Sequence, residues 1–217
     1  MKDLVIIGAG DFGREVAAMV ERINNVNEEW SLLGFVDDNP ELKGCKVDGY
    51  KVIGNSEWLS QQDKKIYAVC SIGNSKTREV FIKRISKNNN IEFAILIDPS
   101  AILMNNTKIG KGSIICAGAI LTINVEVGVH SIINLSCTIG HDTKTGNYFT
   151  AHPGTNISGK VIIGDASYFG TGCKVIQGIS ISKHCIFGAG TVIVKSITES
   201  GTYVGVPAKK SRYNVEG

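Results

Sequence analysis

The sequence has little of several features that would assign it to a specialised class of protein. Its 217 residues carry a net charge of only +3 and 7% aromatic residues, which provides no footprint for nucleic acid or an anionic membrane. No apolar run reaches the roughly 18 residues of a membrane span, and the first residues lack a signal-peptide layout. We therefore expect a soluble cytoplasmic protein with no nucleic-acid partner and no membrane insertion.

The cysteines also lack a recognisable pattern. None of them forms a C-x-x-C pair, which argues against a zinc ribbon or a redox motif, and we expect no metal site. Because no signal peptide points to an oxidising compartment, we expect reduced cysteines that mostly fill space in the core. The six are Cys45, Cys70, Cys116, Cys137, Cys173 and Cys185.

Charge and glycine are distributed unevenly along the chain. Residues 1–100 hold 28 charged residues and 8 glycines, whereas residues 101–200 hold 11 charged residues and 14 glycines. Such a shift in composition predicts two different architectures. We place the domains at residues 1–98 and 99–217, with the boundary near Pro99.

The first hundred residues alternate between strand and helix patterns. Short apolar runs at 4–7, 32–36, 66–70 and 93–97 are separated by helix-like stretches at about 13–25 and 75–87, while 40–65 looks irregular. Strands that alternate with helices predict a parallel sheet of the Rossmann type.

A glycine-rich turn follows the first predicted strand and opens the first predicted helix. Gly8, Gly10 and Gly13 match the G-x-G-x-x-G pattern, whose backbone approaches a phosphate at a helix N-terminus. An acidic residue about 20 positions later binds ribose hydroxyls in such sites, and Asp37 fits this role. NAD(P) and another nucleotide ligand both fit the motif, and a turn kept for packing alone is the alternative.

The second half of the chain repeats with a period of one hexad. From Ile97 to Ile193, every sixth position is large and apolar except Thr145 and Ala151. Hexad repeats are typical of β-helices, in which three hexads form one triangular coil. We expect about five coils over 109–193, with the glycine after the apolar residue either needing positive φ or leaving no room for a side chain. The two exceptions follow or interrupt the segment around His141, and such departures often mark function.

Several motifs in a fixed order resemble the PglD/NeuD family of acetyl-CoA-dependent sugar acetyltransferases. They are VIIGAGDFGREVA, FVDDNPELKG, CSIGNSKTRE, the hexads with IGHD, and YVGVPAKK. The resemblance implies an α/β plus all-β fold, a short Rossmann-like parallel-sheet domain followed by a left-handed parallel β-helix. It also implies a homotrimer that binds acetyl-CoA between neighbouring subunits and a nucleotide-linked amino sugar at the N-terminal domain.

The resemblance assigns roles to residues of both domains. It makes His141 the general base with Asp142 as its acidic partner, and Gly159 the amide donor to the thioester oxygen. It implies that acetyl-CoA contacts Thr150, Gly159, Thr171 and Ala189. It implies that the nucleotide sugar contacts Gly10, Asp11, Phe12, Asp37, Asp38, Gly73 and Arg78. Phe12 and Thr150 stand where relatives often carry histidine.

Four functions are compatible with parts of the sequence. The resemblance favours N-acetylation of a nucleotide-linked amino sugar for bacterial glycan or surface polysaccharide synthesis, with O-acetylation of sialic acid or another sugar hydroxyl as the alternative. An NAD(P)-dependent oxidoreductase or a β-helical scaffold without activity would leave the pair His141 and Asp142 unexplained. We interpret His130 and His184 as solvated corner residues, and His152 as structural or secondary.

Overall fold

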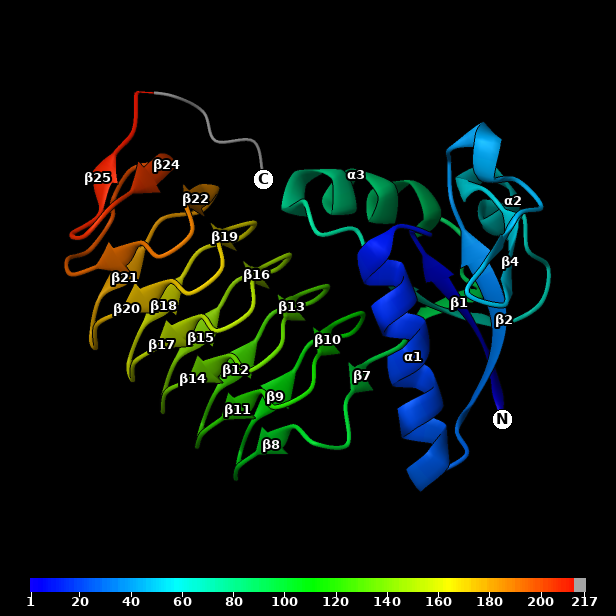
Figure 1. Ribbon diagram of the computed structural model, residues 1–217, viewed down its shortest axis with the longest axis horizontal. Helices are drawn as coiled ribbons and strands as arrows, with labels where there is room; N and C mark the ends of the chain where they lie inside the picture. The colour runs from blue at the N-terminus through cyan, green and yellow to red at the C-terminus, as the bar shows by residue number, and fades with distance from the viewer. Residues whose placement is uncertain (213–217) are drawn as a thin grey trace. The chain divides into compact units, whose positions relative to one another are not determined.

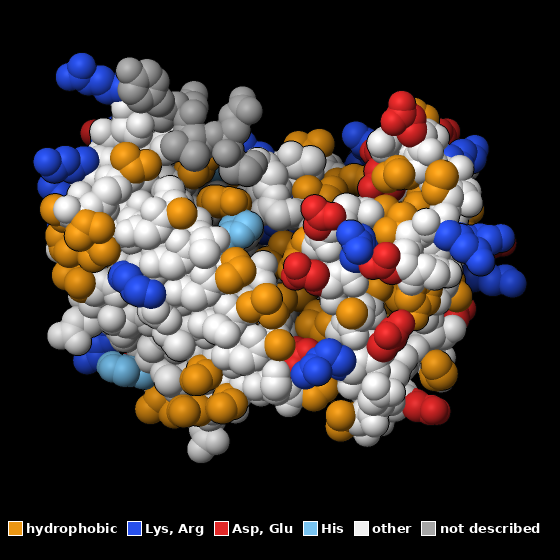
Figure 2. Space-filling view, viewed as in Figure 1, with side chains coloured by type: hydrophobic (Ala, Val, Ile, Leu, Met, Phe, Trp, Pro, Cys, Tyr) orange, Lys and Arg blue, Asp and Glu red, His pale blue; other side chains and the backbone are white. Residues whose placement is uncertain are grey.

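A computed structural model describes residues 1–212 of the chain (Figure 1). The chain divides into two compact units, Met1–Pro99 and a second unit that begins at Ser100. Within the described residues, no helix is long and apolar enough to cross a membrane. On the face drawn in Figure 2, charged side chains are dense over the first unit and sparse over the second, as the composition predicts.

The first unit contains a six-stranded sheet in the order β3-β4-β2-β1-β5-β6. Its strand pairs are parallel except β3 with β4. Because β2 and β5 lie on opposite sides of β1, the order reverses at β1, which is where ligands bind in open α/β sheets. The strands are β1 (Lys2–Ile7), β2 (Trp30–Val36), β3 (Lys46–Val47), β4 (Tyr50–Gly54), β5 (Ile66–Cys70) and β6 (Ile91–Phe93).

Three helices accompany this sheet. Helix α1 (Asp11–Val26) has an apolar face at helical spacing that is buried at Val16, Ala17, Met19 and Val20. Helix α3 (Ser75–Ile85) begins after Asn74, whose side chain accepts a hydrogen bond from the Thr77 amide. Helix α2 (Ser56–Ser60) packs against α3.

The segment 40–65 is not irregular, contrary to the expectation from its sequence. It contains a short 3-10 helix at Pro40–Leu42, the β3–β4 hairpin and α2. These elements are too short to produce a readable period in the sequence. The predicted strand at 93–97 likewise divides into β6 and β7 (Leu96–Ile97).

The second unit is a left-handed parallel β-helix, as predicted. Each short strand pairs with the strand three hexads later, for example Ile120 with Thr138 and Thr138 with Asn156. Three hexads therefore complete one coil, and the coils stack along the unit (Figure 1). The strands of the first stacked coils are β8 (Ile102–Leu103), β9 (Lys108–Ile109), β10 (Ile114–Ile115), β11 (Ile120–Leu121), β12 (Glu126–Val127), β13 (Ile132–Ile133), β14 (Thr138–Ile139), β15 (Lys144–Thr145) and β16 (Thr150–Ala151).

The stack continues to a C-terminal hairpin. Strands β24 and β25 pair antiparallel, and β24 pairs parallel with β22 at the end of one face. The remaining strands are β17 (Asn156–Ile157), β18 (Ile162–Ile163), β19 (Tyr168–Phe169), β20 (Lys174–Val175), β21 (Ser180–Ile181), β22 (Cys185–Phe187), β23 (Val192–Ile193), β24 (Gly201–Val204) and β25 (Lys209–Lys210).

The corners of the coil use left-handed backbone at regular intervals. One corner column holds Asn106, Asn124, Asp142 and Lys160, all with φ between 58° and 61°. Asn and Asp tolerate this conformation better than most residues. The glycines that follow the apolar residue have a different reason: a Cβ on Gly140 would lie 2.5 Å from the Gly159 nitrogen. Of the two explanations expected for these glycines, close approach is therefore correct.

The two departures from the hexad pattern each have a local structural explanation. Ala151 is small because Phe149, at a position that carries serine in neighbouring coils, turns its ring into the same core. The centroids of the Phe149 and Phe169 rings are 5.3 Å apart, in an edge-to-face arrangement. Thr145 is 8% exposed, and its hydroxyl accepts a hydrogen bond from the Gly128 amide. That these positions mark function stays a prediction.

All six cysteines are free, and all except Cys45 are buried. Burial raises the pKa of the Cys137 and Cys173 thiols to about 11, so both are protonated at neutral pH. Their small side chains face backbone carbonyls of the next coil, as the side chain of Thr143 does at the equivalent position. They act as small core residues, as expected.

The exchange of size between Phe149 and Ala151 gives a test of the core. Phe149→Ser should destabilise the protein by about 3–5 kcal/mol, because it leaves a cavity beside Phe169. Adding Ala151→Ile restores the usual hexad arrangement and should recover most of the loss, whereas Ala151→Ile alone should overpack the core. Urea unfolding of the three variants measures this, and simple additivity of the two single changes would contradict the account.

Candidate active site

His141 and Asp142 occupy the corner between β14 and β15. Asp142 takes a left-handed conformation with φ of 59°, which turns its carboxylate back beside the preceding ring. The His141 Nδ1 and Asp142 Oδ2 atoms are 2.8 Å apart. Their side chains are 53% and 42% exposed, so the pair is accessible to a ligand.

Hydrogen bonds favour the ionised form of the Asp142 carboxyl in this pair. The hydrogen bond with His141 is the main cause that lowers the pKa of Asp142, and a hydrogen bond from Asn124 lowers it further. An ionised carboxylate only accepts hydrogen bonds, so the proton of neutral His141 lies on Nδ1. The Nε2 lone pair is then available to accept a proton.

Gly159 lies one coil beyond His141 and supports its ring. A Cβ on Gly159 would lie 2.5 Å from Nε2 and 2.7 Å from Cε1 of His141, so the ring occupies space that any side chain would fill. No hydrogen bond is made by the Gly159 amide within the part of the chain that the structure describes. A hydrogen-bond donor therefore lies next to a proton acceptor, which is the arrangement that acyl transfer needs.

Asn124 belongs to the same corner and was not identified from the sequence. Its Nδ2 donates to Asp142 Oδ1 at 2.9 Å. The signal was present, since Asn106, Asn124 and Asp142 follow one another at intervals of three hexads. Reading the sequence in columns of one full coil rather than of one hexad would have found it.

The other three residues expected to contact acetyl-CoA lie elsewhere on the coil. Thr171 and Ala189 are exposed at the corner that precedes the face containing β14, whereas His141 is at the corner that follows it. Thr150 lies on β16 and is 1% exposed. One protomer therefore brings Gly159 to His141 and places Thr171 and Ala189 one full face away.

In the first unit, the glycine turn and the loop after β5 both lie at the carboxyl end of the sheet, beside the point where strand order reverses. Gly8 has φ of 98°, and a Cβ on Gly13 would lie 2.1 Å from the Gly8 carbonyl oxygen. Gly8 is therefore favoured by its backbone conformation, and Gly13 is required by packing. Gly10 and Gly73 have no atom within 4 Å of a Cβ, so the turn itself does not require them to be glycine.

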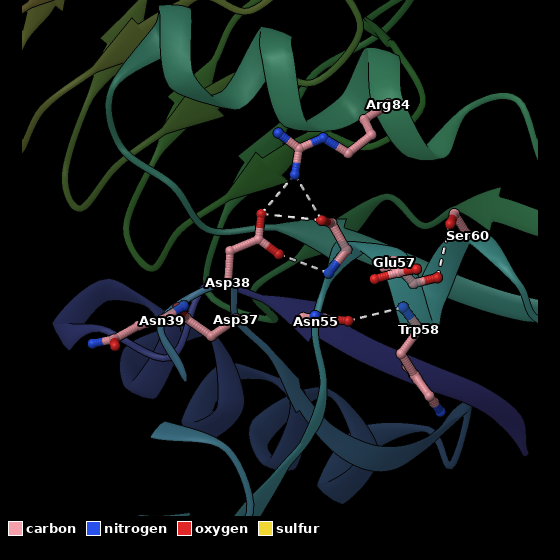
Figure 3. Close-up of polar contacts among 9 residues, drawn as sticks. Asp37, Asp38, Asn39, Asn55, Glu57, Trp58, Ser60 and Arg84 are labelled. Atoms are coloured by element: carbon pink, nitrogen blue, oxygen red, sulfur yellow. Dashed lines mark hydrogen bonds and ion pairs between the residues drawn. The ribbon is translucent and has the colours of Figure 1, made fainter. Parts of the chain in front are cut away.

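Asp37 and Asp38 hold this end of the sheet together (Figure 3). Asp37 accepts hydrogen bonds from the amides of Ala9 and Asn39, each at 2.8 Å. Asp38 accepts from the amide and hydroxyl of Ser56 and from Arg84 Nη1. Both carboxylates therefore have partners within the protein, and their part in ligand binding stays a prediction.

The other predicted residues of this unit differ in exposure. Arg78 is fully buried and donates to the carbonyl oxygens of Ile72 and Gly73, so it shapes the loop after β5. Asp11 is exposed and Phe12 is half-buried, both in the first turn of α1. No side chain caps this helix at Gly10.

The remaining histidines are less solvated than expected. His130 is only 5% exposed and stacks on Tyr148 at 5.4 Å, because both occupy the same corner column. His184 is half-buried in that column, so the prediction of a solvated residue is wrong for His130 and holds only in part for His184. His152 packs against Tyr168 at 4.7 Å. Among residues 1–212, no group of three or more His, Cys, Asp or Glu side chains could hold a metal ion.

Comparison with known proteins decides the family. The PglD N-terminal domain family matches residues 3–85. GDP-perosamine N-acetyltransferase from Escherichia coli is 30% identical over 190 residues, which are 85% of this chain and 82% of the relative. The chain belongs to the PglD/NeuD family of sugar acetyltransferases. The prediction of an acetyltransferase is thereby confirmed.

Solved structures similar to this acetyltransferase cover nearly its whole length. The acetyltransferase domain of PglB from Neisseria gonorrhoeae is 28% identical with a TM-score of 0.87, over 97% of this chain and 100% of that one. WeeI from Acinetobacter baumannii is 27% identical with a TM-score of 0.87, over 97% and 100%. PerB from Caulobacter crescentus, in complex with CoA and GDP-perosamine, is 26% identical with a TM-score of 0.84, over 97% and 98%.

The contact between Gly159 and His141 yields a direct prediction. Gly159→Ala should displace the imidazole and reduce acetyl transfer by at least about tenfold, since small displacements at a reacting centre are costly. The melting temperature should change little, because the clash is with a movable, half-exposed side chain. Steady-state kinetics and thermal unfolding measure the two effects.

A matched control removes the ring. In a His141→Ala background, Gly159→Ala should have no further effect on either activity or stability. Unchanged activity of Gly159→Ala on its own would contradict the geometry.

Proposed function

We propose that this acetyltransferase transfers the acetyl group of acetyl-CoA to the amine of a nucleotide-linked amino sugar, in bacterial glycan or surface polysaccharide biosynthesis. The proposal rests mainly on the unshared proton acceptor of His141 beside the Gly159 amide. The name of the Escherichia coli relative and the ligands of the Caulobacter structure support this choice of donor and acceptor.

His141 acts as general base in the proposed reaction. Nε2 removes a proton from the amine as its nitrogen attacks the thioester carbonyl carbon. A C–N bond forms and the C–S bond breaks, and the proton passes from His141 to the departing thiolate of CoA. Asp142 stabilises the imidazolium that exists between these transfers, because its carboxylate already contacts Nδ1.

The Gly159 amide stabilises the charge that develops on the thioester oxygen. A backbone N–H is fixed by the coil, so it needs no reorganisation when that charge forms. Its lack of a partner in the described part of the chain leaves it available for this contact. Placing the carbonyl there brings the carbonyl carbon close to the base.

We further propose that the enzyme is a homotrimer with acetyl-CoA bound between subunits. Thr171 and Ala189 lie on a different corner from His141 and Gly159, so one cosubstrate that touches both corners needs the β-helices of two neighbouring subunits. Thr150 lies on β16, on the face that precedes the corner of Thr171, and because it is 1% exposed its contact with acetyl-CoA stays a prediction. Analytical ultracentrifugation reports the assembly directly.

The first unit holds the nucleotide in this proposal. Gly10, Asp11 and Phe12 present backbone amides at the uncapped start of α1, where a phosphate is favoured. Gly73 lies in the loop after β5, next to the point where the strand order reverses. Asp37, Asp38 and Arg78 contribute mainly by holding the loops in place, as their internal hydrogen bonds indicate.

A thiol-release assay with acetyl-CoA tests the reaction. Turnover is expected with at least one of a panel of UDP-, dTDP- and GDP-linked amino sugars, and His141→Ala should reduce it by about 10²- to 10⁴-fold. His184→Asn is the matched control, because it alters a histidine at another left-handed corner, and its activity should stay within about twofold of the parent.

The same assay distinguishes the alternative function. Turnover with sialic acid and with none of the nucleotide sugars would replace N-acetylation by O-acetylation. Full activity of His141→Ala would remove His141 from the mechanism.

A further inference from the structure

Three side chains form a continuous hydrogen-bonded line along the corner that leads to His141. Asn106 Nδ2 donates to Asn124 Oδ1 at 3.2 Å, and Asn124 Nδ2 donates to Asp142 Oδ1 at 2.9 Å. The second oxygen of Asp142 meets His141 Nδ1 at 2.8 Å. Each coil thus contributes one link, and the line ends at the proposed base.

The line has a fixed direction. Asn106 donates to the amide oxygen of Asn124, and the amide nitrogen of Asn124 faces the opposite way, toward Asp142, an orientation that the contact with the Asp142 carboxylate suffices to fix. An amide nitrogen only donates and a carboxylate only accepts, so this orientation matches the contact. The asparagine is therefore held in the one orientation that serves Asp142.

We propose that Asn124 is a positioning residue that orients the Asp142 carboxylate and, through it, selects the Nδ1-protonated form of His141. This inference rests on the proposed role of His141 as base. Asp142 is 42% exposed, so one hydrogen bond to an imidazole does not by itself fix its rotation. With Oδ1 held by Asn124, the other oxygen is directed at Nδ1.

The charged groups around the pair do not supply this direction. Lys160, one coil beyond Asp142, attracts its carboxylate electrostatically. Glu126 and Lys144 line the same shallow depression of about 550 Å³ as Asn124 and Asp142, and they form an ion pair of 3.1 Å with each other. Charges act over distance, whereas the neutral amide acts through one directed hydrogen bond without altering net charge.

The backbone suits a clean substitution. Asn124 has φ of 58° and Asn106 has φ of 61°, and glycine adopts this conformation without strain. Asn124→Gly therefore removes the amide while it keeps the corner, and Asn124→Asp keeps the shape but presents a carboxylate to a carboxylate. Asn106→Gly is the matched control at the same corner, one coil away from Asn124.

The first readout is the tautomer of neutral His141, measured by ¹⁵N NMR of the free enzyme. The hydrogen bond made by one ring nitrogen sets the tautomer. We expect mainly the Nδ1–H form in the parent and in Asn106→Gly, and a clear fall in its share in Asn124→Gly and Asn124→Asp. Asp142→Gly, which removes the carboxylate, marks the largest fall possible.

The second readout separates kcat from KM in the thiol-release assay. Asn124→Gly should lower kcat about three- to tenfold with little change in KM, as the loss of one hydrogen bond predicts. Asn106→Gly should stay within about twofold of the parent. In an Asp142→Gly background, Asn124→Gly should cause no further loss, since its effect acts through that carboxylate.

The two readouts fail independently. An unchanged tautomer in Asn124→Gly would overturn the positioning role, whether or not the enzyme is active on the panel. An equal loss of kcat in Asn106→Gly, or an undiminished loss in the Asp142→Gly background, would also overturn it. Absence of turnover in the parent enzyme with the tautomer behaving as expected would instead contradict the proposed reaction and leave Asn124 as the group that orients the pair.

Discussion

The pairing of each strand with the strand one coil later is the constraint on which the second unit depends. It sets each residue directly against the equivalent residue of the next coil. The size and polarity of one side chain therefore limit which side chain fits at the equivalent position of the next coil. Large apolar residues stack on each other in the core of the β-helix. Glycine is required at corners where the backbone of the next coil approaches closely. The exchange between Phe149 and Ala151 shows that the core is satisfied by total volume, not by each hexad separately.

The same constraint assembles the candidate active site. The His141 ring packs against Gly159 of the next coil, and Asp142 accepts a hydrogen bond from Asn124 of the previous coil. Three consecutive coils thus hold one imidazole by backbone spacing and two hydrogen bonds. A site built on regular structure keeps its geometry better than one on a loop, even though this pair is half-exposed. The first unit instead presents loops at the carboxyl end of its sheet.

The sequence predicted what regular periods encode. The hexad period indicated the β-helix, and the alternating runs with Gly8 to Gly13 indicated the parallel sheet. Prediction failed where elements are short, as in the hairpin and helix between residues 40 and 65. It also misjudged His130, because the stacking of that ring on Tyr148 depends on the neighbouring coil.

The pair His141 and Asp142 could be proposed from their order in the sequence and from the resemblance, but their surroundings could not be predicted. Asn124 lies one coil before Asp142 in the sequence, and its contact emerges only once the coil is closed. The internal partners of Asp37 and Asp38 are likewise set by the fold of segments far away in the chain. A role that depends on contacts between equivalent positions of successive coils can be assigned only once the register of the coils is known.

A structure of the enzyme with CoA and an amino sugar nucleotide tests the central claim most directly. We expect the sugar amine within about 2.6–3.2 Å of His141 Nε2, the reach of a general base, with the sulfur of CoA beside the Gly159 amide. An amine bound out of reach of His141, or next to a different base, would contradict the account.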